Sequence, residues 1–228
     1  MNRPTQQKIA PGSTFKVVSS VAGLEEGVIS TGTMIHDNVT FDKITPSPKC
    51  WSTAGHGSIN VSGALEVSCN YFFYTVGYKL SGLTHGQVNN ARGLSRLKKY
   101  ADMFGLTDRS GVELPESEPN FSKTDAVRSA IGQATHSYAL IQLSRYVTTV
   151  ANSGTCYDLT LIDQVKDVNG NVILDNHAKV RNTVNIANST WKAVHNGMYR
   201  VVNGSRSSIG SMSVSYTHLR AHETSLHL

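Results

Sequence analysis

Apolar residues recur at helical spacing in six stretches of this chain, which predicts six helices joined by loops. The predicted helices span residues 13–26, 61–67, 70–80, 91–104, 138–152 and 190–202. Gly105 follows the fourth helix and Gly154 follows the fifth, and glycine is typical of the position just after a helix. The helix over 138–152 is predicted from its apolar positions, which are Leu140, Ile141, Leu143, Val147 and Val150.

Strand signals are short and lie between these helices. Residues 28–58 are rich in Gly, Thr, Ser, Pro and Asp, which favours short strands and loops. Residues 105–135 form a loop-rich connector. A β-hairpin is predicted over 159–174, because Asn169-Gly170 stands between two apolar runs and this dipeptide is a strong turn signal.

Composition excludes several classes of protein. With 228 residues, 39% of them apolar and 16% charged, the chain can bury a core and is not of the disordered type. The formal net charge of +5 comes from scattered residues with no aromatic residues among them, so nucleic acid is not an expected partner. Neither a membrane-spanning stretch nor a signal peptide is evident in the sequence.

Three cysteines cannot form a complete set of disulfides, and they show no Cys-x-x-Cys spacing. Cys50, His56 and Cys69 could form a zinc site, but their spacing fits no standard metal pattern. Packing as a small apolar residue is a sufficient explanation for Cys69. We therefore expect no metal ion and no cofactor.

The segment that carries the clearest chemistry is Ala10-Pro11-Gly12-Ser13-Thr14-Phe15-Lys16. Pro11 and Gly12 interrupt regular structure before an apolar helix, so Ser13 falls in a first helical turn where free N–H groups favour an anion. Lys16 follows three residues later on the same face. A lysine amine that is partly removed from water loses proton affinity and can act as the base for a nucleophilic serine.

The Ser-x-x-Lys pattern alone is weak, because it occurs twice more in this chain. Ser95 and Lys98 lie in a basic stretch that is typical of a solvated helix face, and Ser189 precedes an apolar helix as an N-cap would. Ser13 taken alone could equally be a helix cap.

A second candidate pair is Ser68 and Asn70, which lie between two predicted helices. A hydroxyl and a carboxamide two residues apart can point into one cleft, where the serine can relay a proton and the amide can hold a carbonyl. The same spacing at Ser58 and Asn60 lies on a strand-like stretch facing solvent. An ordinary helix cap would also explain Ser68.

Several further segments accompany the two motifs along the chain; they are 5–12, 23–27, Gly55-His56-Gly57 with 64–73, Ala130-Ile131-Gly132-Gln133 with 141–143, and 151–155 with 191–202. In their order and spacing, these segments and the two motifs resemble the transpeptidase domain of penicillin-binding proteins, whose motifs are Ser-x-x-Lys, Ser-x-Asn and Lys-Thr-Gly. The resemblance covers about residues 2–212 and is to the class B, monofunctional type of elongation, division or sporulation. It implies the α+β fold shared with serine β-lactamases, here mostly its helical part with much of the central antiparallel sheet missing.

The resemblance also implies roles for the residues. Ser13 would be the acylated nucleophile, Lys16 its base, Ser68 the proton relay and Asn70 the contact to the substrate's amide. The Ser13 N–H would supply half of an oxyanion hole. The implied reaction cross-links peptidoglycan stem peptides in the bacterial cell wall, and β-lactams would acylate Ser13. The parent protein would be anchored in the cell membrane, act on its extracytoplasmic face and belong to a cell-wall synthesis complex that maintains cell shape.

The chain departs from this family in two places. Lys-Thr-Gly does not occur, and residues 213–228 resemble translated sequencing-adapter read-through, a non-native tail after a partial domain at 1–212. We expect this shortened chain to be inactive. We also expect apolar helix faces to lie exposed where the sheet would cover them, with Phe15, Val18, Met198 and Val202 as candidates.

Four alternatives remain open at the level of sequence. Within the family these are a D,D-carboxypeptidase and a serine β-lactamase. From other classes, they are a non-catalytic β-lactam sensor and a helical domain without enzymatic activity, in which Ser13 and Ser68 are caps.

Overall fold

The computed structural model describes residues 2–207. Each of its two units combines two separate stretches of the described chain, 2–29 with 73–187 in the first unit and 30–72 with 188–207 in the second. The expected tail at 213–228 lies outside the described residues. Within the described part of the chain, no helix is both long and apolar enough to cross a membrane.

Helices dominate the first unit. They are α1 (Arg3–Gln6), the 3₁₀ turn η1 (Gly12–Phe15), α2 (Lys16–Glu25), α5 (Asn90–Met103), α6 (Ala126–Ser129) and α7 (Leu140–Ala151). Helix α4 (Asn70–Ser81) begins in the second unit and ends in the first. Helix α2 packs on α5, and α5 packs on α6. The helices predicted from apolar spacing are thus confirmed, with bounds that differ by a few residues.

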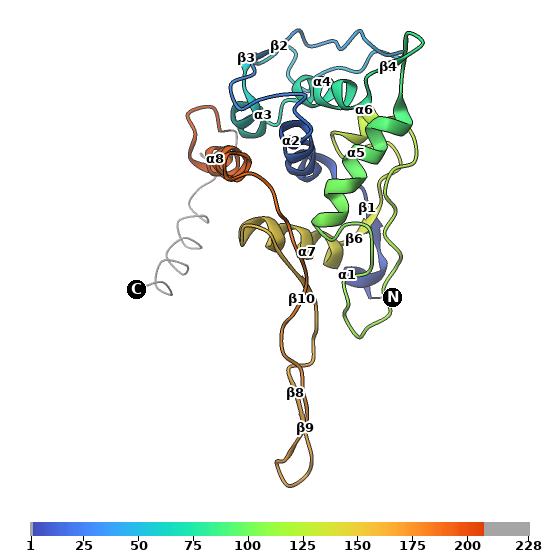
Figure 1. Ribbon diagram of the computed structural model, residues 1–228, viewed down its shortest axis with the longest axis vertical. Helices are drawn as coiled ribbons and strands as arrows, with labels where there is room; N and C mark the ends of the chain where they lie inside the picture. The colour runs from blue at the N-terminus through green and yellow to red at the C-terminus, as the bar shows by residue number, and fades with distance from the viewer. Residues whose placement is uncertain (1, 208–228) are drawn as a thin grey trace. The chain divides into compact units, whose positions relative to one another are not determined.

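The strands of the first unit form four antiparallel pairs. They are β1 (Lys8–Ile9) with β6 (Tyr138–Ala139), β4 (Leu83–Thr84) with β5 (Gln87–Val88), β7 (Thr155–Asp158) with β10 (Lys179–Thr183), and β8 (Gln164–Lys166) with β9 (Val172–Asp175). Strands β8 and β9 form the hairpin predicted around Asn169-Gly170 and continue the ribbon of β7 and β10 (Figure 1). The pairing of β7 with β10 was not predicted, because twenty residues separate the two strands.

The second unit contains one antiparallel pair, β2 (Ile35–Asp37) with β3 (Gly57–Ile59), and two helices that lie side by side, α3 (Val61–Glu66) and α8 (Asn188–Asn203) (Figure 1). The two helices approach closely at Gly197, where a Cβ atom would lie 2.7 Å from the Leu65 side chain. The Ser62 hydroxyl donates to the Ala193 carbonyl at 2.7 Å. Glycine at Gly197 therefore allows the helix contact.

A buried ion pair also joins α3 and α8. The Glu66 carboxylate, at the end of α3, pairs with the Arg200 guanidinium and accepts a hydrogen bond from the Arg206 N–H at 3.1 Å. The Glu66 side chain is almost fully buried, so its charge depends on these partners.

Helix α7 buries a different face from the one that its apolar residues suggest. Its buried side chains are Gln142, Arg145, Tyr146, Thr149 and Val150, whereas Leu140 and Val147 are 45% and 48% exposed. Arg145 Nη2 donates to the carbonyls of Gly105 and Asp108 and pairs with the Asp108 carboxylate, whereas Nε and Nη1 are buried without a hydrogen-bond partner among the described residues. Fixed partners in the connector therefore allow the polar face to be buried.

The expectation that Phe15 and Val18 lie exposed is wrong. Both side chains are completely buried, and the Phe15 ring packs 4.5 Å from the His136 ring and 6.3 Å from the Phe121 ring, centroid to centroid. Phe121 and His136 therefore cover the Phe15 ring of η1. Met198 and Val202, the other two candidates, are half-buried.

Candidate active site

Ser13 lies in the 3₁₀ turn η1, directly before α2. The Lys16 N–H bonds to the Ser13 carbonyl, which closes the turn, and residues three apart eclipse each other in 3₁₀ geometry. Ser13 and Lys16 therefore share one face. The Ser13 side chain is exposed, whereas the Lys16 side chain is 1% exposed and its ammonium nitrogen lies 5.7 Å from the centre of the Phe73 ring.

Burial of the lysine separates this pattern from the other two Ser-x-x-Lys patterns. Lys98 and Lys192 are both exposed, on the surfaces of α5 and α8. Ser95 is exposed on α5, as expected for a solvated helix face. Ser189 lies inside the first turn of α8, which begins at Asn188, so its assignment as the N-cap is wrong by position.

Gly132 holds the start of the Ser13 turn in place. The Gly12 N–H donates to the Gly132 carbonyl at 3.1 Å. A Cβ atom on Gly132 would lie 2.0 Å from the Gly12 carbonyl oxygen, and Gly132 has a φ of +72°. Both facts require glycine at this position, because side chains tolerate neither the overlap nor the left-handed backbone.

The Tyr146 hydroxyl on α7 anchors the turn, because it donates to the Thr14 carbonyl at 2.8 Å. Burial raises the pKa of Tyr146 far above its usual value, so this phenol stays a donor. The helix that follows the turn has its own anchor, because the Ser19 hydroxyl on α2 donates to the Ala130 carbonyl at 2.7 Å. The turn is thus held by Gly132 and Tyr146, and α2 is held by Ala130.

His136 supports the same turn from beneath Phe15. Its Nδ1 accepts hydrogen bonds from the Ser122 N–H at 3.2 Å and the Tyr138 hydroxyl at 2.9 Å. Burial lowers the pKa of His136 to about 4, so the ring is neutral near pH 7.

Ser68 and Asn70 lie at the junction of α3 and α4 in the second unit. Ser68 has a φ of +49°, which turns the chain between the two helices, and Asn70 is the first residue of α4. Both side chains are half-buried. The Trp51 indole N–H lies 3.1 Å from the carbonyl oxygens of both Val67 and Ser68 and donates to them.

The competing pair at Ser58 and Asn60 has structural partners. The Asn60 side chain accepts from the Gly63 N–H at 3.0 Å and caps α3, and the Ser58 hydroxyl bonds to the His36 ring at 3.0 Å. Asn60 is thus a helix cap, whereas Ser58 faces solvent as expected.

A cluster of four donor side chains lies next to Ser68; they are Asp37, Cys50, His56 and Cys69, and we call them the Cys50–Cys69 cluster. His56 Nδ1 lies 2.7 Å from Asp37 Oδ2, and the Cys69 thiol donates to the same oxygen at 3.3 Å. The two sulfur atoms are 3.9 Å apart, and Cys50 Sγ lies 3.5 Å from His56 Nδ1.

Hydrogen bonding within the cluster shifts the pKa values of its two thiols in opposite directions. The Cys69 thiol lowers the pKa of Cys50 to about 6 against the effect of burial. The pKa of Cys69 is raised strongly by its bond to Cys50 and by burial. Burial favours the protonated form of Asp37, but the hydrogen bonds from His56 and the Val39 N–H overcome this and lower its pKa.

This cluster could hold a metal ion. Its four donor atoms, two sulfurs, one nitrogen and one oxygen, lie within 4.8 Å of one another, and His56 Nε2 is buried without a hydrogen-bond partner among the described residues. Four protein donors of this kind suit a structural Zn²⁺ ion. The structure thus brings together the three residues considered from the sequence and adds Asp37. Cys69 is fully buried as expected, but its thiol contacts a carboxylate.

A model of the penicillin-binding protein transpeptidase domain matches residues 1–221 of the chain. The chain belongs to the penicillin-binding protein transpeptidase family. Penicillin-binding protein 2B of Streptococcus pneumoniae is 28% identical over 213 residues, which cover 85% of this chain and 31% of that protein. The peptidoglycan D,D-transpeptidase MrdA of Acinetobacter baumannii is 29% identical over 171 residues, which cover 68% of this chain and 24% of that protein.

Solved transpeptidase structures confirm the fold class. The structure of penicillin-binding protein 2B from Streptococcus pneumoniae strain R6 superimposes with a TM-score of 0.76 and 26% identity, covering 89% of this chain and 36% of that one. The α+β transpeptidase fold expected from the motifs is therefore present. This chain spans about a third or less of the length of the relatives that it matches.

Sequence reasoning missed two residues of these arrangements, Tyr146 at the Ser13 turn and Asp37 in the Cys50–Cys69 cluster. Tyr146 lies outside the apolar pattern of its helix, so only the contact of α7 with Thr14 reveals its role. Asp37 lies thirteen residues before Cys50 and is brought close by the pairing of β2 with β3. The sequence contained no signal for either contact.

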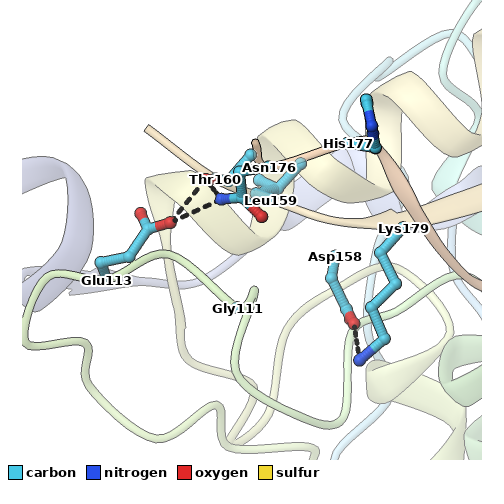
Figure 2. Close-up of a pocket in the computed structure, with 8 residues that line it drawn as sticks. All are labelled: Gly111, Glu113, Asp158, Leu159, Thr160, Asn176, His177 and Lys179. Carbon is cyan, nitrogen blue, oxygen red and sulfur yellow. Dashed lines mark hydrogen bonds and ion pairs between the residues drawn. The ribbon is translucent and has the colours of Figure 1, made fainter. Parts of the chain in front are cut away.

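One cavity of about 370 Å³ lies in the first unit, away from the predicted site residues of that unit (Figure 2). Its charged side chains already have partners: the Glu113 carboxylate accepts from the Leu161 N–H at 3.0 Å, and Lys179 pairs with Asp158 at 3.3 Å. Neither Ser13 nor Lys16 lines this cavity. It supplies no nucleophile for transpeptidase chemistry.

Proposed function

We propose that the chain is the nucleophile-bearing part of a peptidoglycan D,D-transpeptidase that works through an acyl-serine intermediate. One observation carries the proposal. Among the three Ser-x-x-Lys patterns, Ser13 alone combines an exposed hydroxyl with a buried lysine one turn later, on a turn anchored by Gly132 and Tyr146. A buried amine beside an exposed hydroxyl suits a base and a nucleophile.

In the proposed acylation, the Ser13 oxygen attacks the carbonyl carbon of the penultimate D-alanine of a stem peptide, and Lys16 takes the hydroxyl proton. The peptide bond to the terminal D-alanine then breaks, and its nitrogen takes up a proton through Ser68. An amine of a neighbouring stem peptide next attacks the Ser13 ester. Ser13 regains its proton, and a new peptide bond joins the two stems. The scheme is complete without a cofactor.

The remaining assignments concern charge and orientation. The Ser13 N–H, at the start of a helical turn, would stabilise the oxyanion, and Asn70 would hold the substrate's amide. A β-lactam would acylate Ser13 in the same way as the stem peptide and would then remain bound to it as an ester. The names of the relatives, a penicillin-binding protein and a peptidoglycan D,D-transpeptidase, support this choice of substrate and inhibitor.

We infer that the parent protein works on the extracytoplasmic face of the cell membrane within a cell-wall synthesis complex. Its substrate is found there, and the relatives carry names that belong to cell-wall synthesis. Lys-Thr-Gly does not occur in this sequence, and we expect the chain by itself to acylate poorly, because that motif would supply a second oxyanion donor.

Labelling with a fluorescent penicillin tests the assignment in the longer protein that carries this segment. Ser13→Ala should abolish labelling. Lys16→Arg should slow it by about 10²–10⁴-fold, because a guanidinium keeps its proton and cannot act as the base. Ser95→Ala is the matched control, since it removes an exposed serine of the same pattern and should leave labelling unchanged.

Two outcomes would overturn the proposal. Labelling that persists in Ser13→Ala would place the nucleophile elsewhere. Normal labelling of the Lys16→Arg protein would show that Lys16 has only a structural role.

A further inference from the structure

We propose that Cys50 and Cys69 are a modification site, at which a small peroxide joins the two sulfurs in a reversible disulfide. The bond would connect the loop between β2 and β3 to the residue that separates Ser68 from Asn70. Its formation is independent of the transpeptidase function proposed above. Only its effect on Ser68 and Asn70 rests on that function.

The geometry of the pair favours this bond. The two sulfur atoms are 3.9 Å apart and in direct contact, and they would have to approach to about 2.05 Å to form a disulfide. Cys50 lies on a loop, which can adjust, and its N–H bonds to the Val39 carbonyl at 2.7 Å. Cys69 is held at a helix junction by its own N–H, which donates to the Ala64 carbonyl at 2.9 Å.

Accessibility selects the oxidant and the order of events. Cys50 is 6% exposed and Cys69 is completely buried, so only a small molecule can reach the pair, and it reaches Cys50 first. Cys50 is therefore the sulfur that reacts with the oxidant, and Cys69 is the one that completes the bond. Redox-active cysteine pairs likewise combine a reacting sulfur with a resolving one beside it, and here the less buried Cys50 takes the first role.

The reaction balances with hydrogen peroxide as the two-electron oxidant. The Cys50 sulfur attacks one peroxide oxygen, the O–O bond breaks, and Cys50 becomes a sulfenic acid as one water leaves. The Cys69 sulfur then attacks the Cys50 sulfur and displaces the hydroxyl group. The Cys69 proton passes to Asp37 Oδ2, its hydrogen-bond acceptor at 3.3 Å, and then to the departing hydroxyl, which leaves as a second water.

The bond would act directly on the backbone around Ser68. Cys69 is covalently linked to both Ser68 and Asn70, and Trp51, the neighbour of Cys50, donates its indole N–H to the Ser68 carbonyl. Cys69 is thus bonded directly to Ser68, and Cys50 is connected to Ser68 through Trp51 and its hydrogen bond.

Peptide mass spectrometry on the whole chain tests the proposal. Trypsin releases residues 50–79 as one peptide, because Lys79 is the first basic residue after Cys50, and Cys156 lies in the separate peptide 146–166. The reduced chain is treated with a chelator to remove metal, then with hydrogen peroxide, and its free thiols are alkylated. The 50–79 peptide should lose two hydrogen atoms and take up no alkyl group, and dithiothreitol should restore two alkylation sites.

The chain offers its own controls. Cys156 is a free, buried cysteine, and no hydrogen bond between the described residues joins it to Cys50 or Cys69, so its peptide should stay fully alkylated. The variants Cys50→Ser and Cys69→Ser should show no loss of hydrogen. In denaturant the bond should form at least about tenfold more slowly, because folding holds the sulfurs in contact.

Three results would overturn the proposal. They are two alkylated cysteines in the 50–79 peptide after peroxide, oxidation of Cys50 to a sulfinic acid without a disulfide, and disulfide formation that is equally fast in denaturant. The measurement reads the bond alone, so failure of penicillin labelling would leave its result intact.

Discussion

Replacing Gly132 with alanine tests whether the contact with Gly12 holds the Ser13 turn. The added Cβ would lie 2.0 Å from the Gly12 carbonyl oxygen, 2.8 Å from its carbonyl carbon and 2.9 Å from its nitrogen. All three are backbone atoms, so no side chain can rotate away. The start of the turn must move, and the Gly12 N–H must leave the Gly132 carbonyl.

The magnitude of the effect is the sum of three costs. A left-handed backbone at an alanine costs about 1–2 kcal/mol. Loss of the Gly12–Gly132 hydrogen bond costs about 1 kcal/mol. Overpacking against a fixed backbone costs about 1–3 kcal/mol. Gly132→Ala should therefore lower the free energy of unfolding by about 3–6 kcal/mol, a large share of the stability of an ordinary domain.

Gly170→Ala is the matched control for this experiment. Gly170 also has a positive φ, of +85°, but a Cβ there would meet no atom within 4 Å. Its substitution by alanine should lower the free energy of unfolding only by the cost of the left-handed backbone, about 1–2 kcal/mol. Denaturant unfolding of the two variants beside the parent chain measures the difference, and penicillin labelling of the longer protein should fall only for Gly132→Ala.

Equal unfolding free energies for the Gly132→Ala and Gly170→Ala variants would refute this reasoning. They would mean that the Gly12 turn moves aside at no cost and is not held by the contact with Gly132.

Two further predictions concern His136 and α7. Burial lowers the pKa of His136 from 6.5 to about 4, so the folded protein favours the neutral ring. The stability that this contributes is fully present above pH 6.5 and is lost as the pH falls toward 4. The total loss is about 3 kcal/mol. The difference in unfolding free energy between the parent chain and His136→Gln should follow that pH window, and a pH-independent difference would contradict it. On α7, Leu140→Lys with Val147→Lys should reduce self-association in light scattering and change stability by less than about 0.5 kcal/mol per site. Val150→Lys, at a buried position on the same helix, should unfold the first unit, and equal destabilisation by the exposed pair would refute the assignment of faces.

The parts of the fold that could be predicted from sequence are those that depend on local patterns. Apolar spacing and terminal glycines located the helices, and Asn169-Gly170 located the β8–β9 hairpin. The position of Ser13 in a helical turn also follows from Pro11 and Gly12 nearby in the chain. Each of these features is decided within a few residues.

The features that could not be predicted depend on distant partners. The exposed apolar face of α7 contradicts its own pattern because Arg145 finds acceptors at Gly105 and Asp108, about forty residues away. Phe15 is buried because Phe121 of the connector and His136 just after it pack against its ring. Asp37 joins the Cys50–Cys69 cluster only because β2 pairs with β3, and the spacing of apolar residues does not predict which strands pair.

The buried pair of Glu66 and Arg200 has a consequence for the order of synthesis. Glu66 ends α3 and Arg200 lies on α8, so the ribosome adds 134 residues after Glu66 to reach Arg200. At roughly 5–20 residues per second, Glu66 waits about 7–27 s for its partner. During that interval α3 cannot bury its acidic end, because an unpaired carboxylate is costly away from water. The second unit therefore completes its folding only after all of the first unit has been made.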